Sequence, residues 1–344
     1  MSDKSRNQLF IASCVALTVT SMTFAIRAGM IEPLGVEFGL DNQQLGIIIS
    51  TAFWGFPLAV ILGSWLVDYV GMKSMVVIAF ACHILGIVLT IFSGGFWGLF
   101  FSTLLIGIAN GSVEAACNPL VATIYPNDKT TKLNHFHLWF PGGIVIGGLV
   151  AYFLGADMLN WGWKLQMATM LIPAVIYGYL FLKLDFPKTE RIANNISDGE
   201  MYKSILSPLF LFMVVCMFGT AVTELGINQW IGVLLDSATD NALLLLVFIS
   251  SIMALGRGFA GQVVHRISTT GVLLFSAIFA ALGLYLMSIL TGSALFLGAA
   301  IFAAGVTYFW PTMIGFVAEK IPKSGALGMS IIGAIGMFMT ANMQ

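Results

Sequence analysis

Charged residues are scarce in this sequence. Aspartate, glutamate, lysine and arginine together make up 9% of the 344 residues, whereas hydrophobic residues make up 58%. An ordinary soluble domain contains about 25% charged residues, and a water-soluble fold of this length could not bury so much apolar surface. The composition therefore indicates a polytopic membrane protein.

Other features are missing as well. The formal net charge is −1, so the chain lacks the basic excess of a nucleic-acid-binding protein. No phosphate-binding loop or sizeable soluble domain is present, which argues against ATP-driven transport. No metal pair, Ser/His or Ser/Lys set, or pair of facing aspartates of a membrane-embedded hydrolase stands out. The sequence therefore predicts no enzyme, no metal and no cofactor. The few cysteines lie singly in apolar segments, without disulfide or metal spacing: Cys14, Cys82, Cys117 and Cys216.

What the sequence does contain is long apolar runs. Runs of about 20 residues suit a hydrocarbon core roughly 30 Å thick, and turn-forming residues separate them. Such closely spaced runs indicate helical hairpins rather than barrel strands. The eleven predicted spans are residues 9–30, 43–67, 73–93, 96–123, 137–156, 164–183, 207–234, 242–263, 269–290, 293–317 and 324–343.

The longest hydrophilic stretch, residues 184–206, separates six spans from the other five. We predict an N-terminal six-helix bundle at residues 1–190, a cytoplasmic linker at 191–206 and a five-helix C-terminal bundle at 207–344. This is the layout of a transporter with two related halves, with the twelfth helix missing. A truncated chain is the first interpretation, and a genuine eleven-helix protein is the alternative.

The distribution of charge predicts the orientation. Basic residues collect in alternate loops, which the positive-inside rule places in the cytoplasm. Lys164 is the only basic residue in the other loops, which carry acidic residues instead. We therefore expect a multi-pass protein of the cell (inner) membrane with its N-terminus in the cytoplasm. The predicted inner basic residues are Lys4, Arg6, Lys73, Lys129, Lys132, Lys183, Lys188, Arg191, Lys203, Arg266, Lys320 and Lys323.

Glu114 lies inside a long apolar stretch. A carboxylate near the middle of a bilayer costs about 2.5–3.5 kcal/mol even on insertion scales, so such residues usually face a partner or a water-filled path. Asn118 follows four residues later, on the same helix face. The pair predicts a proton or substrate site, and the alternative is a buried glutamate that only joins two helices.

Two loops carry a family motif. GSWLVDYVGMKS, which contains Asp68 and Lys73, resembles the G-x-x-x-D-x-x-G-x-[RK] loop of the major facilitator superfamily, although its glycine-to-aspartate spacing is five. GRGFAGQVVHRIS, which contains Arg257, stands at the equivalent place in the second half. The resemblance implies a fold of two pseudo-symmetric six-helix bundles. It also implies that Asp68, Lys73 and Arg257 lock or gate the bundles.

Spans four and five carry a sharper resemblance. VEAACNPL and KLNHFH resemble the E-x-A-x-N-P and L-N-x-x-[HQ] motifs of the fucose permease branch, the fucose–galactose–glucose proton symporters. The resemblance implies that Glu114 couples transport to protons and that Asn118 binds sugar or shapes the site. The aspartate that this branch carries in its first helix is absent here, and Arg27 occupies the first span instead.

Arg27 lies in the outer half of the first span and Glu224 at a similar depth in the seventh. The first and seventh helices face each other in this superfamily. We therefore hypothesise that Arg27 either pairs with Glu224 as an outer gate or receives an anionic group of the substrate, since a guanidinium matches a carboxylate. The alternative is an arginine that extends to the headgroups.

Polar residues near the end of the seventh span form a second candidate substrate site. Asn228, Gln229 and Trp230 offer amides and an indole, a combination that binds sugars. The alternative is a tryptophan anchored at the membrane interface. His135 and His137 lack the further ligands of a zinc site, and we expect them at the cytoplasmic end of the fifth span as a pH-sensitive element.

The sequence thus predicts a monomeric secondary transporter that moves a small polar solute, most of all a sugar, with protons by alternating access. A sugar-acid or organic-anion transporter is the second interpretation, because of Arg27 and the missing aspartate. Drug efflux is the third. A sensor derived from a transporter would bind ligand without net flux.

Overall fold

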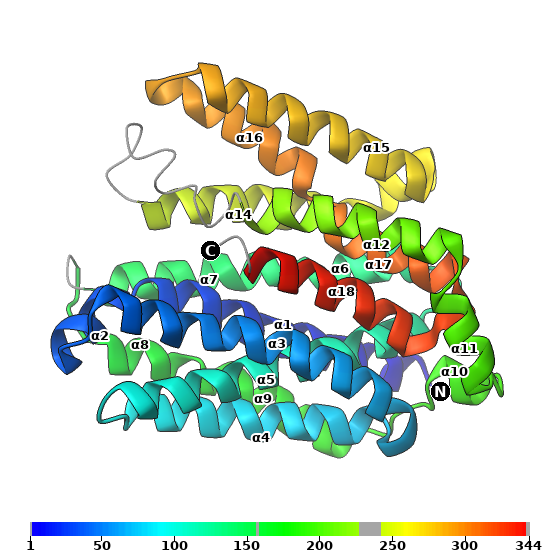
Figure 1. Ribbon diagram of the computed structural model, residues 1–344, viewed down its shortest axis with the longest axis horizontal. Coiled ribbons are helices and arrows are strands. Elements are labelled where there is room, and N and C mark those ends of the chain that lie inside the picture. Colours follow the sequence, from blue (N-terminus) through cyan, green and yellow to red (C-terminus); the bar gives the residue numbers. More distant parts are fainter. Residues whose placement is uncertain (1, 156–157, 227–241, 342–344) are drawn as a thin grey trace.

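The computed structural model describes residues 2–155, 158–226 and 242–341, and every regular element within these ranges is a helix. The long helices run roughly side by side along the long axis of the molecule (Figure 1). Within these ranges, ten helices are long and apolar enough to cross a membrane. The all-helical architecture predicted from the sequence is therefore observed in these ranges.

The first half contains six predicted spans, two of which consist of two helices joined end to end. A short helix, α2 (Ile31–Phe38), follows the first span, and Gly39 ends it in the left-handed conformation (φ 62°) that glycine adopts without strain. The other helices of this half are α1 (Asp3–Ala28), α3 (Asn42–Val70), α4 (Met72–Ile91), α5 (Phe96–Ile124), α6 (Lys129–His137), α7 (Trp139–Leu154), α8 (Trp163–Thr169) and α9 (Leu171–Lys183).

Two short helices form the linker, and the second half follows. The linker helices are α10 (Glu190–Ala193) and α11 (Asp198–Ile205). The second half comprises α12 (Pro208–Ala221), the π-helical turn η1 (Val222–Gly226), α14 (Ala242–Gly258), α15 (Ala260–Ile289), η2 (Gly292–Ala294), α16 (Leu295–Val306), α17 (Phe309–Lys320), η3 (Pro322–Ser324) and α18 (Gly325–Ala341).

The predicted boundary between spans 242–263 and 269–290 falls inside α15. Ser268 has a non-helical backbone there (φ 63°, ψ 164°), so the element is two helices joined at a kink. The span predicted at 242–263 corresponds to α14 and the first turns of α15, and its apolar part, Leu246–Gly258, is shorter than a full span. Ten long helices and this shorter one thus lie at predicted spans, and the part of the span predicted at 207–234 that follows Gly226 lies outside the described residues.

The fifth span begins earlier than predicted. Its first helix, α6, starts at Lys129 rather than residue 137. The sequence KTTKLNHFH is too polar to appear as a membrane span, but Lys129, Thr130 and Asn134 are buried by other helices rather than exposed to lipid. Because burial within protein does not require an apolar sequence, hydropathy alone missed this helix.

Glycines allow α5, which carries Glu114, to lie against α3. A Cβ atom at Gly111 would lie 2.2 Å from the carbonyl oxygen of Phe56, and one at Gly107 would lie 2.5 Å from that of Ala52. No side chain fits at either position, so the two backbones approach closely, as small residues permit between membrane helices. This contact places Glu114 in the interior of the helix assembly.

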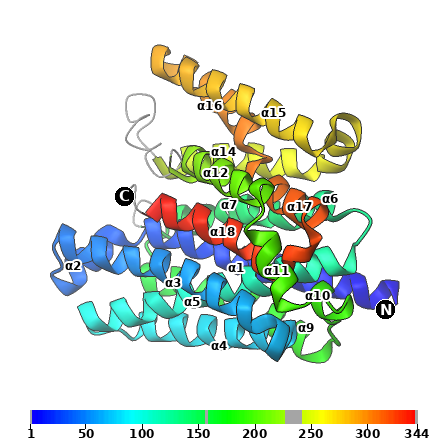
Figure 2. The same ribbon diagram turned by 45° about the vertical axis from the view of Figure 1, so that its right-hand side comes forward.

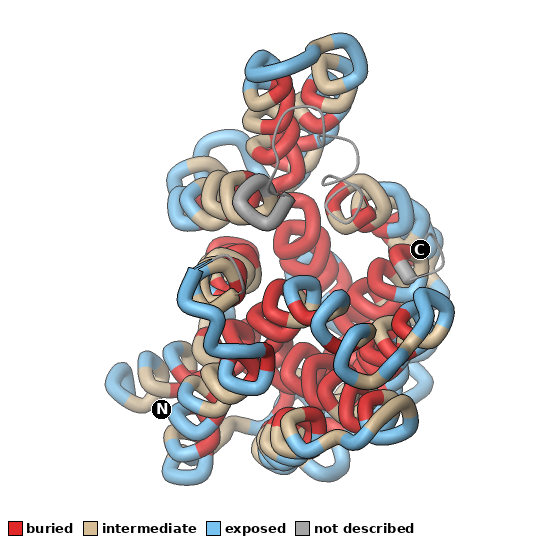
Figure 3. Tube along the Cα trace, turned by 90° about the vertical axis from the view of Figure 1, so that its left-hand side faces the viewer, coloured by how far each residue is buried: buried red, intermediate tan, exposed pale blue. Residues whose placement is uncertain are grey.

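The two halves share a core. Buried residues gather along the centre of the assembly (Figure 3), and one hydrophobic cluster joins Phe56 and Val113 of the first half to Met313 and Ile332 of the second. The N-terminus and linker helices α10 and α11 lie at one end, which we name the linker end, and α2 lies at the other, the α2 end (Figures 1 and 2). By the predicted orientation, the linker end is cytoplasmic.

Candidate functional site

Glu114 lies in the middle of α5 and is 4% exposed. Asn118, one turn further along the same helix, donates a hydrogen bond from Nδ2 to Glu114 Oε2 at 2.5 Å. The four-residue spacing therefore brings the two side chains together, as the sequence predicted. The amide gives the buried carboxylate a polar partner.

His137 extends this pair to a second helix. Its Nε2 lies 2.9 Å from Asn118 Oδ1 and 3.8 Å from Glu114 Oε2. Because Asn118 uses its amide nitrogen toward Glu114, its oxygen accepts from His137, which assigns the proton of a neutral imidazole to Nε2. The prediction that His137 stands at the cytoplasmic end of its span is wrong: it is 1% exposed, because the helix begins two turns earlier at Lys129.

Arg257, at the end of α14, connects the two halves. Its Nη1 donates to the carbonyl oxygen of His137 at 2.8 Å, and its Nη2 donates to Glu224 Oε1 at 2.8 Å. A third bond runs from Nε to the carbonyl oxygen of Thr307 at 2.6 Å. Glu224 lies on the π-helical turn η1, and such turns in α-helices are frequent at functional sites. Arg257 is thus held by both halves.

Glu114, His137, Glu224 and Arg257 line one small cavity of about 10 Å3. A space of this size holds at most a single water molecule. The cavity contains two carboxylates and one guanidinium. We name these four residues together with Asn118 the polar cluster.

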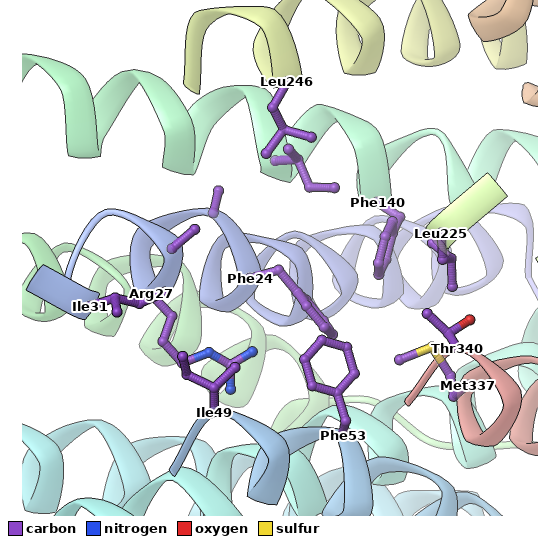
Figure 4. A pocket seen from close by; sticks show the side chains of 13 residues that line it. Phe24, Arg27, Ile31, Ile49, Phe53, Phe140, Leu225, Leu246, Met337 and Thr340 are labelled. Atoms are coloured by element: carbon purple, nitrogen blue, oxygen red, sulfur yellow. The ribbon is translucent and has the colours of Figure 1, made fainter. Parts of the chain in front are cut away.

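A larger cavity of about 240 Å3 lies beside the polar cluster, between the halves (Figure 4). The two cavities share Phe140, Leu225 and Met337 as lining residues. Three apolar side chains therefore line both the cavity of the polar cluster and a space large enough for a small ligand. This larger cavity extends to Arg27, near the α2 end.

Arg27 lies over two aromatic rings. Its Cζ is 5.5 Å from the ring centroid of Phe24 and 5.8 Å from that of Phe53, and Figure 4 shows these side chains along one wall of the cavity. Nη1 is buried without a hydrogen-bond partner among the described residues. The hypothesised Arg27–Glu224 pair is not formed in this structure, because Glu224 binds Arg257 instead.

At the linker end, Asp68 binds the linker. Its Oδ2 lies 2.9 Å from Arg191 Nη1, and its Oδ1 accepts a hydrogen bond from Thr189 at 2.5 Å. Arg191 also pairs with Asp198 and packs against Gly325, the first residue of α18. Lys73 instead donates to carbonyl oxygens of the first half, at Leu182 and Leu184, so the structure does not bring it to the contact between halves.

The halves also meet at the linker end through α6 and α17. Glu319 Oε1 accepts hydrogen bonds from the backbone nitrogen of Thr130 at 2.9 Å and from its hydroxyl at 2.6 Å. Asn134 donates to Thr312 Oγ1 at 3.2 Å. Sequence reasoning missed Thr130 and Glu319, because their significance depends on a contact between residues 189 positions apart. The one available signal was the polar sequence of α6.

A glutamate in α2 joins that helix to α8 at the other end. Glu37 Oε2 accepts a hydrogen bond from the Trp163 indole at 2.5 Å, and Lys164 Nζ lies 3.1 Å from Glu37 Oε1. The hydrogen bond from Trp163, followed by that from Lys164, lowers the pKa of Glu37 from its ordinary value of 4.5. The carboxylate is therefore ionised at neutral pH.

A buried histidine network in the first half was also missed. His83 Nδ1 lies 2.8 Å from the Tyr177 hydroxyl, and its Nε2 lies 2.8 Å from Asn110 Oδ1. Asn110 in turn donates to Thr23 Oγ1 at 3.0 Å. Each group has a partner when His83 is neutral and carries its proton on Nε2. The network joins α1, α4, α5 and α9.

Two points remain, the predicted substrate residues near the end of the seventh span and the arrangement of possible metal ligands. Asn228, Gln229 and Trp230 lie outside the described residues. Within the described part of the chain, no group of three His, Cys, Asp or Glu side chains is arranged to hold a metal ion.

The helical fold, the central polar cluster and the cavity between two halves define a polytopic membrane protein of the transporter class. A family model of the Major Facilitator Superfamily matches residues 9–341. The chain therefore belongs to the Major Facilitator Superfamily.

Known structures agree with this fold at low sequence identity. The Escherichia coli fucose:proton symporter aligns with a TM-score of 0.78 and 14% identity over 97% of this chain and 90% of that one. A proton:xylose symporter bound to 6-bromo-6-deoxy-D-glucose aligns with a TM-score of 0.80 and 15% identity, covering 100% and 88%. At these identities the likeness shows the fold alone.

The sequence relatives are named as transporters of different solutes. A probable chloroplastic anion transporter of Arabidopsis thaliana is 25% identical over 181 residues, which are 52% of this chain and 34% of the relative. A gentisate transporter of Corynebacterium glutamicum is 23% identical over 218 residues, 60% of this chain and 48% of the relative. The chain thus spans less than half the length of these two relatives.

Proposed function

We propose that the protein couples the movement of a small organic solute to the movement of protons, with Glu114 as the proton-binding residue. The observation that carries this proposal is the charge of the polar cluster. Two carboxylates and one guanidinium are enclosed around a space for at most one water molecule. Carboxylates outnumber guanidinium groups by one, so one added proton makes the enclosed cluster neutral. Because burying uncompensated charge is costly, the cluster is more stable when enclosed with that proton. Closure of the site is thereby linked to proton uptake.

Glu114 is the better candidate for that proton. Glu224 already has a charged hydrogen bond from Arg257 at 2.8 Å, whereas the hydrogen bond that Glu114 receives comes from a neutral amide. A charged partner stabilises the ionised form of a carboxylate more than a neutral partner does. Asn118 and His137 would position Glu114, and Arg257 would connect its state to the second half.

The contacts at the linker end support alternating access. There α6 binds α17, and Asp68 binds Arg191 next to the start of α18. These contacts would hold the linker end closed while the cavity at Arg27 receives solute from the α2 end. With the N-terminus in the cytoplasm, this is a conformation that faces outward. Opening of the linker end would then require the α6–α17 contacts to break.

Two substrate classes have support. The fold is that of fucose and xylose symporters, and the motifs around Glu114 resemble the fucose permease branch, which favours a sugar. The names of two relatives, an anion and a gentisate transporter, favour an organic anion. Drug efflux has no specific observation in its favour.

Uptake into proteoliposomes tests the proposal. We expect an inward proton gradient to drive accumulation of the substrate by the unmodified protein, found by screening neutral sugars, sugar acids and aromatic acids. Glu114→Gln should abolish this accumulation but retain counterflow exchange, because the binding cavity remains. Glu32→Gln, which changes an exposed glutamate of α2, is the matched control and should transport normally.

Proton-driven accumulation that persists in Glu114→Gln would reject the role of Glu114. Ligand binding without either accumulation or counterflow in the unmodified protein would instead favour a sensor.

A further inference from the structure

The larger cavity offers few hydrogen bonds. Of the 13 described residues that line it, only Arg27 and Thr340 carry a polar side-chain group. The Thr340 hydroxyl already donates to the carbonyl oxygen of Gly336 at 2.9 Å. A neutral sugar presents hydroxyl groups on all sides, and each hydroxyl buried without a partner weakens binding. The described walls of this cavity are therefore a poor match for a neutral sugar.

Arg27 has no counter-charge among the described residues. Its guanidinium is packed against the Phe24 and Phe53 rings, and no ion pair or hydrogen bond to it is found among the described residues. A desolvated cation without a partner is unfavourable, and a guanidinium presents parallel N–H donors that match the two oxygens of a carboxylate. A bound carboxylate would balance the charge of Arg27 and accept hydrogen bonds from its N–H groups.

The rest of the cavity suits an apolar ring. Phe24, Phe53 and Phe140 provide aromatic surfaces, and Ile49 and Leu225 provide aliphatic ones. An apolar cavity of roughly 150 Å3 is enough for benzene. The cavity of about 240 Å3 therefore has room for a six-membered ring and a carboxylate group.

We propose that this cavity binds a small organic carboxylate with an apolar body, its carboxylate at Arg27 and its body against the phenylalanine rings. That this ligand is also the transported substrate rests on the proposed function. Binding itself does not depend on Glu114 or on a proton gradient. The two proposals therefore fail in different experiments.

Calorimetric titration of the purified full chain in detergent tests the inference, with benzoate, benzamide, gluconate and D-glucose as probes. We expect benzoate to bind at least tenfold more tightly than benzamide, which has the same ring without the charge. Gluconate, which has the charge without the apolar body, and D-glucose should also bind at least tenfold more weakly. The comparison of probes needs no variant, so it does not depend on whether a variant folds.

Substitutions of Arg27 then test whether this residue recognises the carboxylate. Arg27→Gln should reduce benzoate affinity at least tenfold and leave benzamide unchanged, whereas Arg27→Lys should keep part of the preference. Arg266→Gln, which removes an exposed arginine of α15, is the control and should bind benzoate normally. Equal binding of benzoate and benzamide would overturn the proposal. So would absence of benzoate binding, tighter binding of gluconate or D-glucose, or an unchanged benzoate preference in Arg27→Gln.

Discussion

Buried polar residues in this protein work in connected groups. In the polar cluster, Asn118 satisfies Glu114 on one side and His137 on the other. The sequence predicted the Glu114–Asn118 contact, because a four-residue spacing on one helix is enough to infer it. It could not predict that His137 and Arg257 would join them, since these residues come from other helices and their contacts depend on how the helices pack.

The histidine network allows a prediction of stability. His83→Ala should lower the free energy of unfolding by about 2–4 kcal/mol, because it leaves a cavity and removes the partners of Tyr177 and Asn110. Thermal unfolding in detergent measures this loss. The control is His265→Ala, which removes a largely exposed imidazole and should change the free energy by roughly 0.5 kcal/mol or less. Equal effects of both substitutions would show that the network contributes nothing specific.

Individual helices differ in how well the sequence predicts them. Long apolar helices such as α4 begin and end within a few residues of the predicted limits. The polar helix α6 and the short helix α2 were not predicted, because both are stabilised by contacts with other helices rather than by lipid. In α2 the contact is an ion pair and a hydrogen bond at Glu37. That contact depends on pH.

The α2–α8 contact should weaken in acid. Because the pKa of Glu37 is lowered in the folded protein, its contribution to stability is fully present above the unfolded value near 4.5 and is lost as pH falls through the lower folded value. Glu37→Gln should therefore lower the melting temperature by about 2 °C or less at pH 7.5 and by less near pH 3. Glu32→Gln, in the same helix, is the control. A Glu37→Gln difference that is the same at both pH values would contradict the assignment.

On the scale of the whole molecule, the sequence predicted two halves and a linker between them but not the conformation they adopt. The linker end is closed by α6, α17 and the Asp68–Arg191 pair, while a cavity lies near the α2 end. These contacts join residues more than 100 positions apart. A single sequence contains no pattern that predicts such pairs, so Arg191 was predicted only as a cytoplasmic basic residue of the linker.

Glu319→Ala should favour opening of the linker end, because it removes the acceptor of both Thr130 hydrogen bonds. Spin labels at Asn127 and Lys320, exposed residues on opposite halves, report the separation by pulsed electron resonance. We expect a larger fraction of long distances in Glu319→Ala than in the unmodified protein. Glu37→Ala, at the other end, should leave the distances unchanged. An identical distribution in Glu319→Ala would show that this contact does not hold the halves together.

The unequal number of carboxylates and guanidinium groups in the polar cluster has an energetic consequence for the cell. If one proton and one monovalent carboxylate cross together, no net charge crosses, and the electrical potential of the membrane neither helps nor opposes uptake. Only the pH difference then drives accumulation. Each pH unit is worth about 1.36 kcal/mol, which is about a tenfold concentration ratio at 25 °C. Such a transporter would keep working in a depolarised cell and would stop when the external medium became alkaline.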